Sequence, residues 1–422
     1  MFMRSDLGLF VYGIKICALR VLYELIYTII IVPCLGASEY LFIVDISPLQ
    51  YALSWVVTIS LVPCVFASVI KESIMSTAIS VFYYVSFIPG AVMLGFRKSD
   101  FYCWFYLYYI ILFLGALIVP KKNIVRYRFI KNIDKVLIVI MFGISFFFWA
   151  RYANFRILYD IGNVYGVRLE ARSYSIPSIM SYVFKWLYIF TPFFISWFLD
   201  KKEWFFVIVS MVIGVLLFFY DGQKSILFNM GICFLIAIIM VYGNKTVNAS
   251  SAILNGVIIT EVLSLLEYFL CGSYYIVNFV IRRLCFVPAS LNYCYYEFFS
   301  YHELNYFSDI LRRFGLSPRY ASGLPRTIGK VFFGNPDTNA NNGLFSDAYA
   351  NLGNLGIIMP LFVLLLLWMF DCITQNIHRA VRVSLGFLIS FIIMSTNLTT
   401  GLLTHGIMIM MIVLLFMPAS SQ

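Results

Sequence analysis

Long apolar stretches separated by short polar connections run through this chain from one end to the other. Most of these stretches have the length of roughly 17–25 residues that an α-helix needs to cross a bilayer. A transmembrane β-barrel would instead show short segments of alternating polarity. The pattern therefore predicts an all-α polytopic membrane protein with about 12 transmembrane helices. We expect spans at residues 21–38, 49–70, 74–95, 101–120, 134–151, 179–199, 204–220, 225–242, 251–270, 352–370, 381–397 and 401–418.

The composition agrees with this pattern and narrows the class of partner. The chain has 422 residues, of which 62% are hydrophobic and 12% are charged. Soluble domains carry roughly 25% charged residues, so a soluble protein is excluded. The net charge of +10 does not indicate nucleic acid, because basic residues of membrane proteins follow topology and anionic lipid. Membrane lipid is the expected surrounding, and no nucleic-acid partner is expected.

The distribution of Lys and Arg between the spans predicts the orientation. The connection 121–135 holds six basic residues and one acid, and cytoplasmic loops carry such an excess. With twelve spans, the basic N-terminal segment and the connections 200–203 and 371–380 fall on the same side. Both termini are therefore expected in the cytoplasm. Two sizeable loops then face outward, over residues 152–178 and 271–350, the second lying between spans nine and ten.

These outer loops are unexpectedly basic and aromatic. Segment 271–350 holds seven Lys or Arg, five acids and nine tyrosines. Basic residues on the outer face oppose the positive-inside trend, and local anion binding would explain the cluster. Solvated or lipid-phosphate-facing charges are the alternative, and the better one for any single residue. The tyrosines suit either sugar stacking or an aromatic belt at the membrane interface, and both interpretations remain open.

Motifs for metal or cofactor binding are missing from the sequence. It contains no P-loop, GxGxxG, HExxH, CxxC or paired acids of the DxD type. We therefore expect no metal and no cofactor. Positive side chains, rather than a metal cation, would then stabilise a phosphate group. The planar guanidinium of Arg suits this task.

Four charged residues interrupt the apolar runs, and such residues mark function by default. Glu267 and Lys185 fall towards the outer ends of their spans, and we expect them to form a structural ion pair. A transporter with a proton relay near the midplane would instead use Glu24 and Glu261.

Three short motifs in this topology carry a resemblance to a known family. They are the DGQKS connection at 221–225, the sequence NGLFSDAYANLGNLGI at 342–357, and Arg-x10-Gly spacings from Arg151 to Gly162 and from Arg312 to Gly323. With a dozen spans and large outer loops after the fifth and ninth, the chain resembles the Wzy-type O-antigen polymerases, also called oligosaccharide repeat-unit polymerases. In that family the third and fifth periplasmic loops can carry Arg-x10-Gly motifs.

The resemblance implies a place and a reaction. The chain would be a multi-pass protein of the bacterial inner (cytoplasmic) membrane that acts in lipopolysaccharide biosynthesis. Residues 1–422 would form a single transmembrane domain, with periplasmic loops 152–178 and 271–350 as its catalytic face. It would be a metal-independent glycosyltransferase that joins undecaprenyl-pyrophosphate-linked oligosaccharides, with lipid pyrophosphate as the leaving group. A chain-length regulator is the partner that the family implies.

Candidate residues for each step follow from this expected reaction. For the general base the candidates are His302, Glu303 and Asp347, and His302 titrates nearest neutral pH. Asn342, Asn351 and Gly353 are expected to shape the start of the tenth span, where Asp347 would favour a helix N-terminus. For pyrophosphate binding the candidates are Arg168, Arg172, Lys224, Arg312 and Arg313, with Arg319 and Arg326 in second rank.

Two other functions remain open. An O-antigen ligase would use the same donor with a lipid A-core acceptor, and the two Arg-x10-Gly motifs favour the polymerase. A flippase or transporter for the same lipid-linked oligosaccharide would need a cationic cavity that continues through the membrane, whereas here the basic residues crowd the expected outer face.

Overall fold

The computed structural model describes residues 2–36, 42–70, 72–119, 130–158, 164–243 and 248–418. Within these residues every regular element is helical. Ten helical segments are long and apolar enough to cross a membrane. The prediction of an all-helical polytopic membrane protein is therefore confirmed. The segments are Leu7–Leu35, Pro48–Val69, Ile74–Phe96, Ile133–Arg151, Ser178–Asp200, Trp204–Asp221, Lys224–Tyr242, Ala249–Cys271, Phe345–Ile373 and Leu398–Phe416.

Two predicted spans correspond to shorter helices. The spans expected at 101–120 and 381–397 are α5 (Tyr102–Ile118) and α16 (Arg379–Ser395), each 17 residues long. At about 1.5 Å per residue such a helix is a few ångströms shorter than the bilayer core of about 30 Å. The total of twelve spans, the orientation and the kind of membrane stay predictions.

Two compact units make up the chain. Unit 1 comprises Met1–Pro120, Ser250–Leu367 and Ile393–Leu398, and unit 2 comprises Lys121–Ala249, Trp368–Ile392 and Thr399–Gln422. The predicted outer loop 152–178 thus belongs to unit 2, and the predicted loop 271–350 belongs to unit 1. That residues 1–422 form a single domain, with both loops on one catalytic face, stays a prediction.

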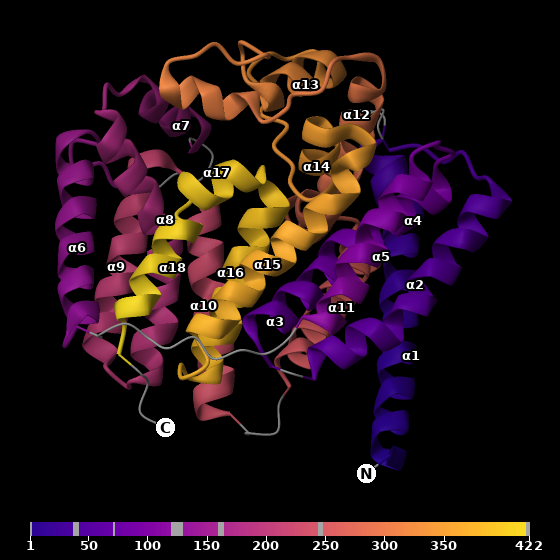
Figure 1. Cartoon of the computed structure of the whole chain (residues 1–422), viewed down its shortest axis with the longest axis horizontal. Helices are drawn as coiled ribbons and strands as arrows, with labels where there is room; N and C mark the ends of the chain where they lie inside the picture. The colour runs from indigo at the N-terminus through magenta and orange to yellow at the C-terminus, as the bar shows by residue number, and fades with distance from the viewer. Residues whose placement is uncertain are drawn as a thin grey trace. The chain divides into compact units, whose positions relative to one another are not determined.

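Unit 1 is organised around α2, which packs against α1, α4 and α5. Aromatic rings of η2 and α5 pack together beside these helices: Phe87 stacks on Phe105 with centroids 6.1 Å apart, and Tyr109 lies 4.8 Å from Phe105. The helices of this part are α1 (Phe2–Ile26), η1 (Tyr27–Leu35), α2 (Pro48–Val69), α3 (Ile74–Val81), η2 (Phe82–Phe87), α4 (Ile88–Phe96), α5 and α11 (Ala249–Cys271), shown in Figure 1.

The first helix begins earlier than the sequence predicted. The chain is already helical at Phe2, so Lys15 and Arg20, both expected before the first span at 21–38, lie within α1. Lys15 donates to Asn255 Oδ1 of α11 at 2.9 Å. Arg20 is buried, with no exposed surface. Polar groups of neighbouring helices form hydrogen bonds with both cations, and these bonds stabilise the two charges within α1.

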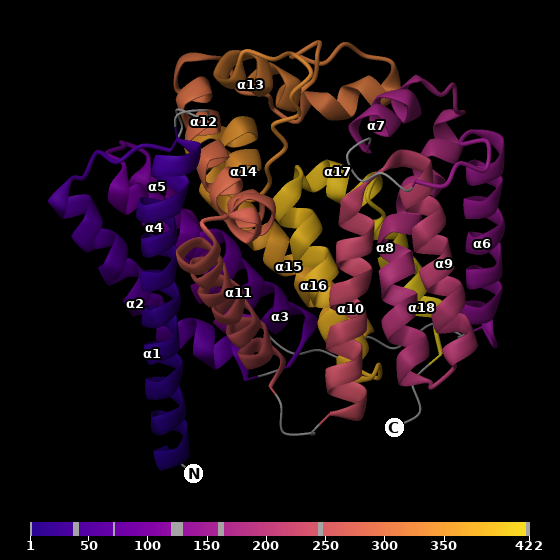
Figure 2. The same cartoon turned by 180° about the vertical axis from the view of Figure 1, so that it is seen from behind.

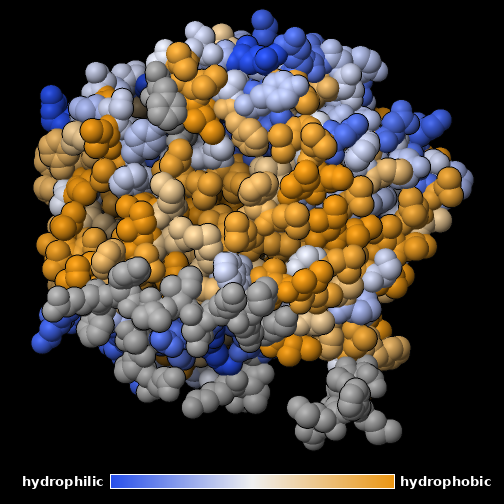
Figure 3. Space-filling model, viewed as in Figure 1, coloured by the Kyte–Doolittle hydropathy of each residue, from blue (hydrophilic) through white to orange (hydrophobic). Residues whose placement is uncertain are grey.

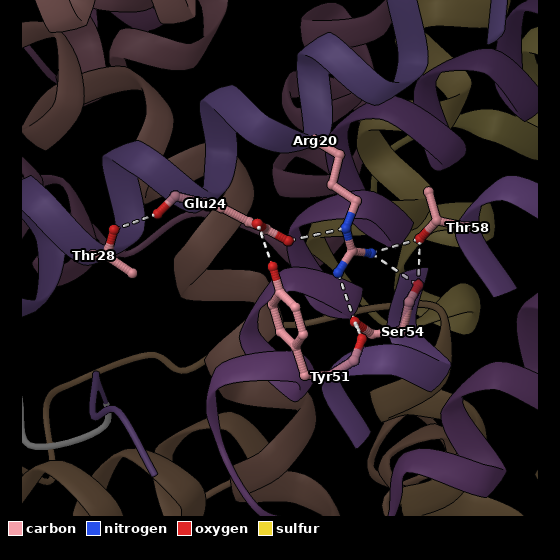
Figure 4. A network of polar contacts seen from close by, with 6 residues as sticks. All are labelled: Arg20, Glu24, Thr28, Tyr51, Ser54 and Thr58. Atoms are coloured by element: carbon pink, nitrogen blue, oxygen red, sulfur yellow. Dashed lines mark hydrogen bonds and ion pairs between the residues drawn. The ribbon is translucent and has the colours of Figure 1, made fainter. Parts of the chain in front are cut away.

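Figure 4 shows how the buried guanidinium of Arg20 is satisfied. Its Nε donates to Glu24 Oε1 at 3.1 Å, and its terminal nitrogens donate to Ser54 and Thr58 of α2 at 2.6–2.9 Å. Tyr51 donates to the other oxygen of Glu24 at 3.0 Å. A buried charge is tolerated when it is paired and hydrogen-bonded, and this network supplies one ion pair and four hydrogen bonds to the guanidinium.

The segment predicted as a long loop, 271–350, is largely helical. The amphipathic spacing of its apolar residues allows short helices to bury one side: Leu324 and Ile328 of α13 are buried, whereas Arg326 and Lys330 are exposed. In Figure 1, α12 and α13 lie at the end of unit 1 away from the start of α1. Hydrophilic residues gather there in Figure 3, and the visible flanks of the spans are apolar. The elements are η4 (Val277–Phe286), α12 (Val287–Tyr301), η5 (Ser308–Phe314), α13 (Leu324–Phe333), α14 (Phe345–Leu352), η6 (Gly353–Ile358) and α15 (Met359–Ile373).

Unit 2 is a bundle in which α8 packs against α9 and α10, and α9 packs against α6. The short helix α7 packs on α9. At the other end of α9, Asp134 pairs with Lys201, which it contacts through Oδ2. The helices are α6 (Ile133–Arg151), α7 (Val164–Ser173), α8 (Ser178–Asp200), α9 (Trp204–Asp221), α10 (Lys224–Tyr242), most of α16, α17 (Leu398–Leu403) and α18 (Ile407–Phe416).

Candidate functional site

The DGQKS connection forms a tight turn in unit 2. Helix α9 ends at Asp221, Gly222 has a φ of +65°, and α10 begins at Lys224. Only glycine adopts this left-handed conformation without strain. A Cβ atom on Gly222 would also lie 3.0 Å from the carbonyl oxygen of Val164 in α7. The glycine thus allows both the reversal of the chain and the close approach of α7.

Asp221 fixes the turn and joins it to α8. Its Oδ2 accepts from Lys185 Nζ at 3.1 Å and from Gln223 Nε2 at 2.7 Å. Its Oδ1 accepts the backbone N–H of Gln223 at 3.1 Å. The carboxylate of Asp221 is 6% exposed and the Lys185 side chain is 30% exposed. The acid is therefore shielded from water, whereas the lysine is partly accessible to it. The ammonium of Lys185 is therefore held in a fixed position at the surface of the bundle.

Helix α7 adds Arg168 to this turn. Arg168 Nε donates to the carbonyl oxygen of Gly222 at 3.1 Å. Glu170 pairs with Arg156 and accepts from the Tyr174 hydroxyl at 2.6 Å. These contacts with Tyr174 and Arg156 lower the pKa of Glu170, whereas burial and the same carboxylate raise the pKa of Tyr174. The short helix is thus attached by a charged cluster and by the turn itself.

Positive charge predominates at this end of unit 2, which we call the cationic end. Within the described residues 151–158, 164–186 and 221–225 there are six basic residues and two acids. Arg172 and Lys224 are exposed, and neither pairs with an acid in the described part of the chain. Lys224 is the first residue of α10, where the helix dipole also favours an anion. The six are Arg151, Arg156, Arg168, Arg172, Lys185 and Lys224, against Glu170 and Asp221.

A half-buried histidine that the sequence analysis did not select lies beside Lys185. His405 interacts electrostatically with Lys185. Its turn is docked on α8, because Trp186 Nε1 donates to the carbonyl oxygen of Leu403 at 2.9 Å. Gly406, with a φ of +81°, directly precedes the first residue of α18. A His-Gly pair directly before an apolar run was the signal in the sequence for a histidine held at a helix start.

In unit 1, two of the predicted base residues follow the end of α12. The His302 ring stacks on Phe298 with centroids 4.0 Å apart, and its Nδ1 lies 2.8 Å from the carbonyl oxygen of Phe298. A carbonyl oxygen can only accept, so Nδ1 carries the hydrogen. In the neutral ring, Nε2 of this exposed residue is then the proton acceptor.

Glu303 and Arg319 form an ion pair in the same segment. The Arg319 guanidinium also lies 5.4 Å from the centre of the Tyr306 ring. Its charge is therefore balanced by an acid, which weakens it as a phosphate ligand. Arg326 is exposed on α13. The side chains of Arg312 and Arg313, like Gly162 of the first Arg-x10-Gly motif, lie outside the described residues.

His302 and Glu303 are exposed, whereas Asp347, the third predicted base, is buried. It is 3% exposed, in the first turn of α14 as predicted. Its oxygens accept from Asn351 Nδ2 at 2.8 Å and from the backbone N–H of Leu398 at 2.7 Å. Asn351 in turn accepts from Asn305 at 3.0 Å. These contacts connect the tenth predicted span to the segment that carries His302, whereas a role for Asp347 as base stays a prediction.

The predicted pairing of Lys185 with Glu267 is wrong. Lys185 bonds Asp221, as described above. Glu267 instead accepts from the Ser273 hydroxyl and from the backbone N–H groups of Tyr275 and Ile276, at 2.7–2.8 Å. Glu267 is thus bonded by groups six to nine residues further along the chain, whereas the partner of Lys185 is 36 residues away and is brought to it by the packing of α8 on α9.

Comparison of the chain with family models, with curated proteins and with solved structures found no match. Within the described residues, no group of three or more His, Cys, Asp or Glu is arranged to hold a metal ion. The fold defines the class: an all-helical polytopic membrane protein.

Proposed function

We propose that this protein is an O-antigen polymerase, a glycosyltransferase that joins undecaprenyl-pyrophosphate-linked oligosaccharide repeat units on the periplasmic face of the bacterial inner membrane. The observation that carries the proposal is the cationic end of unit 2. There Lys224 directly follows a turn that Asp221 holds, and Arg172 is exposed on α7, which contacts this turn through Arg168; neither Lys224 nor Arg172 has an acid partner among the described residues.

The cationic end suits a pyrophosphate leaving group. In the proposed reaction an acceptor hydroxyl attacks the anomeric carbon of the donor, and the bond from that carbon to the pyrophosphate oxygen breaks. Negative charge then develops on the leaving pyrophosphate. Lys224, Arg172 and Arg168 stabilise this charge, and Arg168 is already fixed at the turn by its bond to the carbonyl oxygen of Gly222.

His302 is the base in this scheme. Its Nδ1–H donates to Phe298, so its Nε2 takes the proton of the attacking hydroxyl. Arg326 and Lys330 on α13 offer further positive charge near the same segment. The chain-length regulator that such polymerases imply is part of the proposal as a partner.

The test uses purified protein in liposomes with one synthetic undecaprenyl-pyrophosphate repeat unit, a chelator and no nucleotide sugar. A ladder of longer products supports the polymerase, provided that Lys224→Ala slows its formation by about tenfold to a hundredfold and Lys131→Ala leaves the rate unchanged. Lys131 is an exposed cation before α6, in the part of unit 2 that carries Asp134.

Two outcomes would replace the proposal. Transfer of the oligosaccharide only to an added lipid A-core acceptor would make the protein a ligase. Appearance of unchanged substrate in the opposite leaflet, without any new glycosidic bond, would make it a transporter and remove the catalytic role of the cationic end.

A further inference from the structure

Glu261 is a carboxyl group buried at the centre of a membrane span. It lies near the middle of α11 and is 1% exposed. Figures 1 and 2 show α11 beside α1 and α3 of the same unit. Ser250 of α11 bonds Ser80 of α3 at 2.7 Å, which together with Lys15 and Asn255 fixes α11 on its neighbours. The side of α11 that carries Glu261 therefore faces protein and not lipid.

The groups around Glu261 are weak acids rather than cations. Tyr23 of α1 and Cys285 of η4 interact with the carboxyl group, and both are buried. The Tyr23 hydroxyl also donates to the carbonyl oxygen of Tyr84 at 3.1 Å and lies 3.4 Å from Cys285 Sγ. Three segments far apart in the sequence thus meet at one carboxyl group.

No cation in the described part of the chain pairs with Glu261. The Arg20 guanidinium, on the same helix as Tyr23, is occupied by Glu24, Ser54 and Thr58. Arg282, on the same segment as Cys285, donates from Nε to Asn278 at 3.0 Å. One carboxyl oxygen of Glu261, Oε2, has no hydrogen-bond partner among the described residues.

An ionised carboxylate is not stable in these surroundings. Burying an unpaired charge is far more unfavourable than burying the neutral acid, so such a group takes up a proton. We propose that Glu261, with Tyr23 and Cys285, forms a proton-binding site within unit 1. The ligand is a proton, and this inference does not depend on the proposed glycosyltransferase activity.

The site has a structural consequence. Cys285 belongs to η4, the segment that leads into α12 and His302. The neutral acid is compatible with a closed contact between α1, α11 and η4, whereas a carboxylate requires water or a cation beside it. Loss of the proton therefore opens this contact and frees the start of the segment that carries His302.

The decisive measurement is infrared spectroscopy of the whole protein in lipid at neutral pH. The wild type minus Glu261→Gln difference is expected to contain the carbonyl-stretch band of a protonated carboxyl group. Tyr23→Phe is expected to shift this band, because it removes the neighbouring hydroxyl, and it assigns the band even if Glu261→Gln does not fold. A difference that contains only carboxylate bands, or one that depends on added sodium, overturns the proposal.

The opening is tested with a variant that keeps Cys285 as its only cysteine. Its labelling by a membrane-permeant maleimide is measured against pH, with and without Glu261→Gln. Because the thiol itself reacts faster as pH rises, only the ratio between the two proteins is informative. A ratio that rises with pH supports the site, and a constant ratio overturns the link to η4.

Discussion

Lys185 Nζ lies 3.1 Å from Asp221 Oδ2, and this contact joins the first half of α8 to the last residue of α9. The same carboxylate bonds both the backbone and the side chain of Gln223. One acid thus sets the position of a cation and the shape of the turn before Lys224. Substitution at Asp221 should therefore affect stability and substrate binding together.

For Asp221→Asn we expect a loss of stability of about 1.5–3 kcal/mol, the range for a hydrogen bond to a charged group. The amide keeps the shape of the turn, but Lys185 loses its counter-charge. Thermal unfolding in detergent measures the loss. In the double variant Asp221→Asn/Lys185→Met the loss should be smaller, because no unpaired ammonium remains. Additive effects of the two changes would show that the pair is not coupled.

Lys224→Ala and Arg172→Ala should each lower the rate of polymer formation by about tenfold to a hundredfold, because a charged hydrogen bond to phosphate contributes roughly 1.5–3 kcal/mol. Both side chains are exposed, so the unfolding temperature should not change. Lys224→Arg should keep most of the activity, since the charge remains. Full activity in both alanine variants would remove the cationic end from the mechanism.

His302→Ala should lower activity by roughly 10²–10⁴-fold, the usual contribution of a general base. His302→Asn provides the matched control, because its amide can still donate to the carbonyl oxygen of Phe298 but offers no equivalent of Nε2. We expect a folded but inactive protein. An active Asn variant would show that His302 has only a structural role at the end of α12. As a control, Tyr301→Phe at the neighbouring exposed residue should leave activity unchanged.

Glu170 should make the attachment of α7 sensitive to acid. Its contacts with Tyr174 and Arg156 lower its pKa in the folded protein, so the ionised form is favoured there. This contribution is fully present above the ordinary pKa of a glutamate and is lost as pH falls through the lowered value. The protection of the Val164–Ser173 amides against hydrogen exchange, measured relative to the intrinsic rate at each pH, should fall in that acidic range in the wild type. In Glu170→Gln the protection should already be lower at neutral pH, and the further loss of protection in acid should be absent.

Arg20→Ala should destabilise unit 1 by about 3–5 kcal/mol, the range for removal of one partner of a buried ion pair. The change leaves Glu24 with only Tyr51 and removes the donors to Ser54 and Thr58. Thermal unfolding is the measurement. Arg20→Ala/Glu24→Gln should recover part of the loss, because the remaining unpaired charge is gone, and a double variant as unstable as the sum of the single variants would contradict the pairing.

Several features of the site could be read from the chain in advance. The DGQKS turn is visible because a glycine stands between two apolar runs, and Arg168, Arg172 and Lys224 are visible as cations next to predicted spans. The contact of Arg168 with this turn and the role of Asp221 were not visible, because they depend on where α7 packs. Burial of Asp347 was equally hidden, since its partner N–H lies at Leu398.

By itself the sequence determined that the chain is a polytopic all-helical membrane protein, because the length and apolarity of each run decide whether it can cross a bilayer. Tertiary structure alone decided which charges meet. It paired Lys185 with Asp221 rather than Glu267, buried Arg20 among α2 hydroxyls, and left Glu261 without a described cation. The reason is that hydropathy acts locally along each helix, whereas an ion pair forms only where packing brings two side chains within a few ångströms.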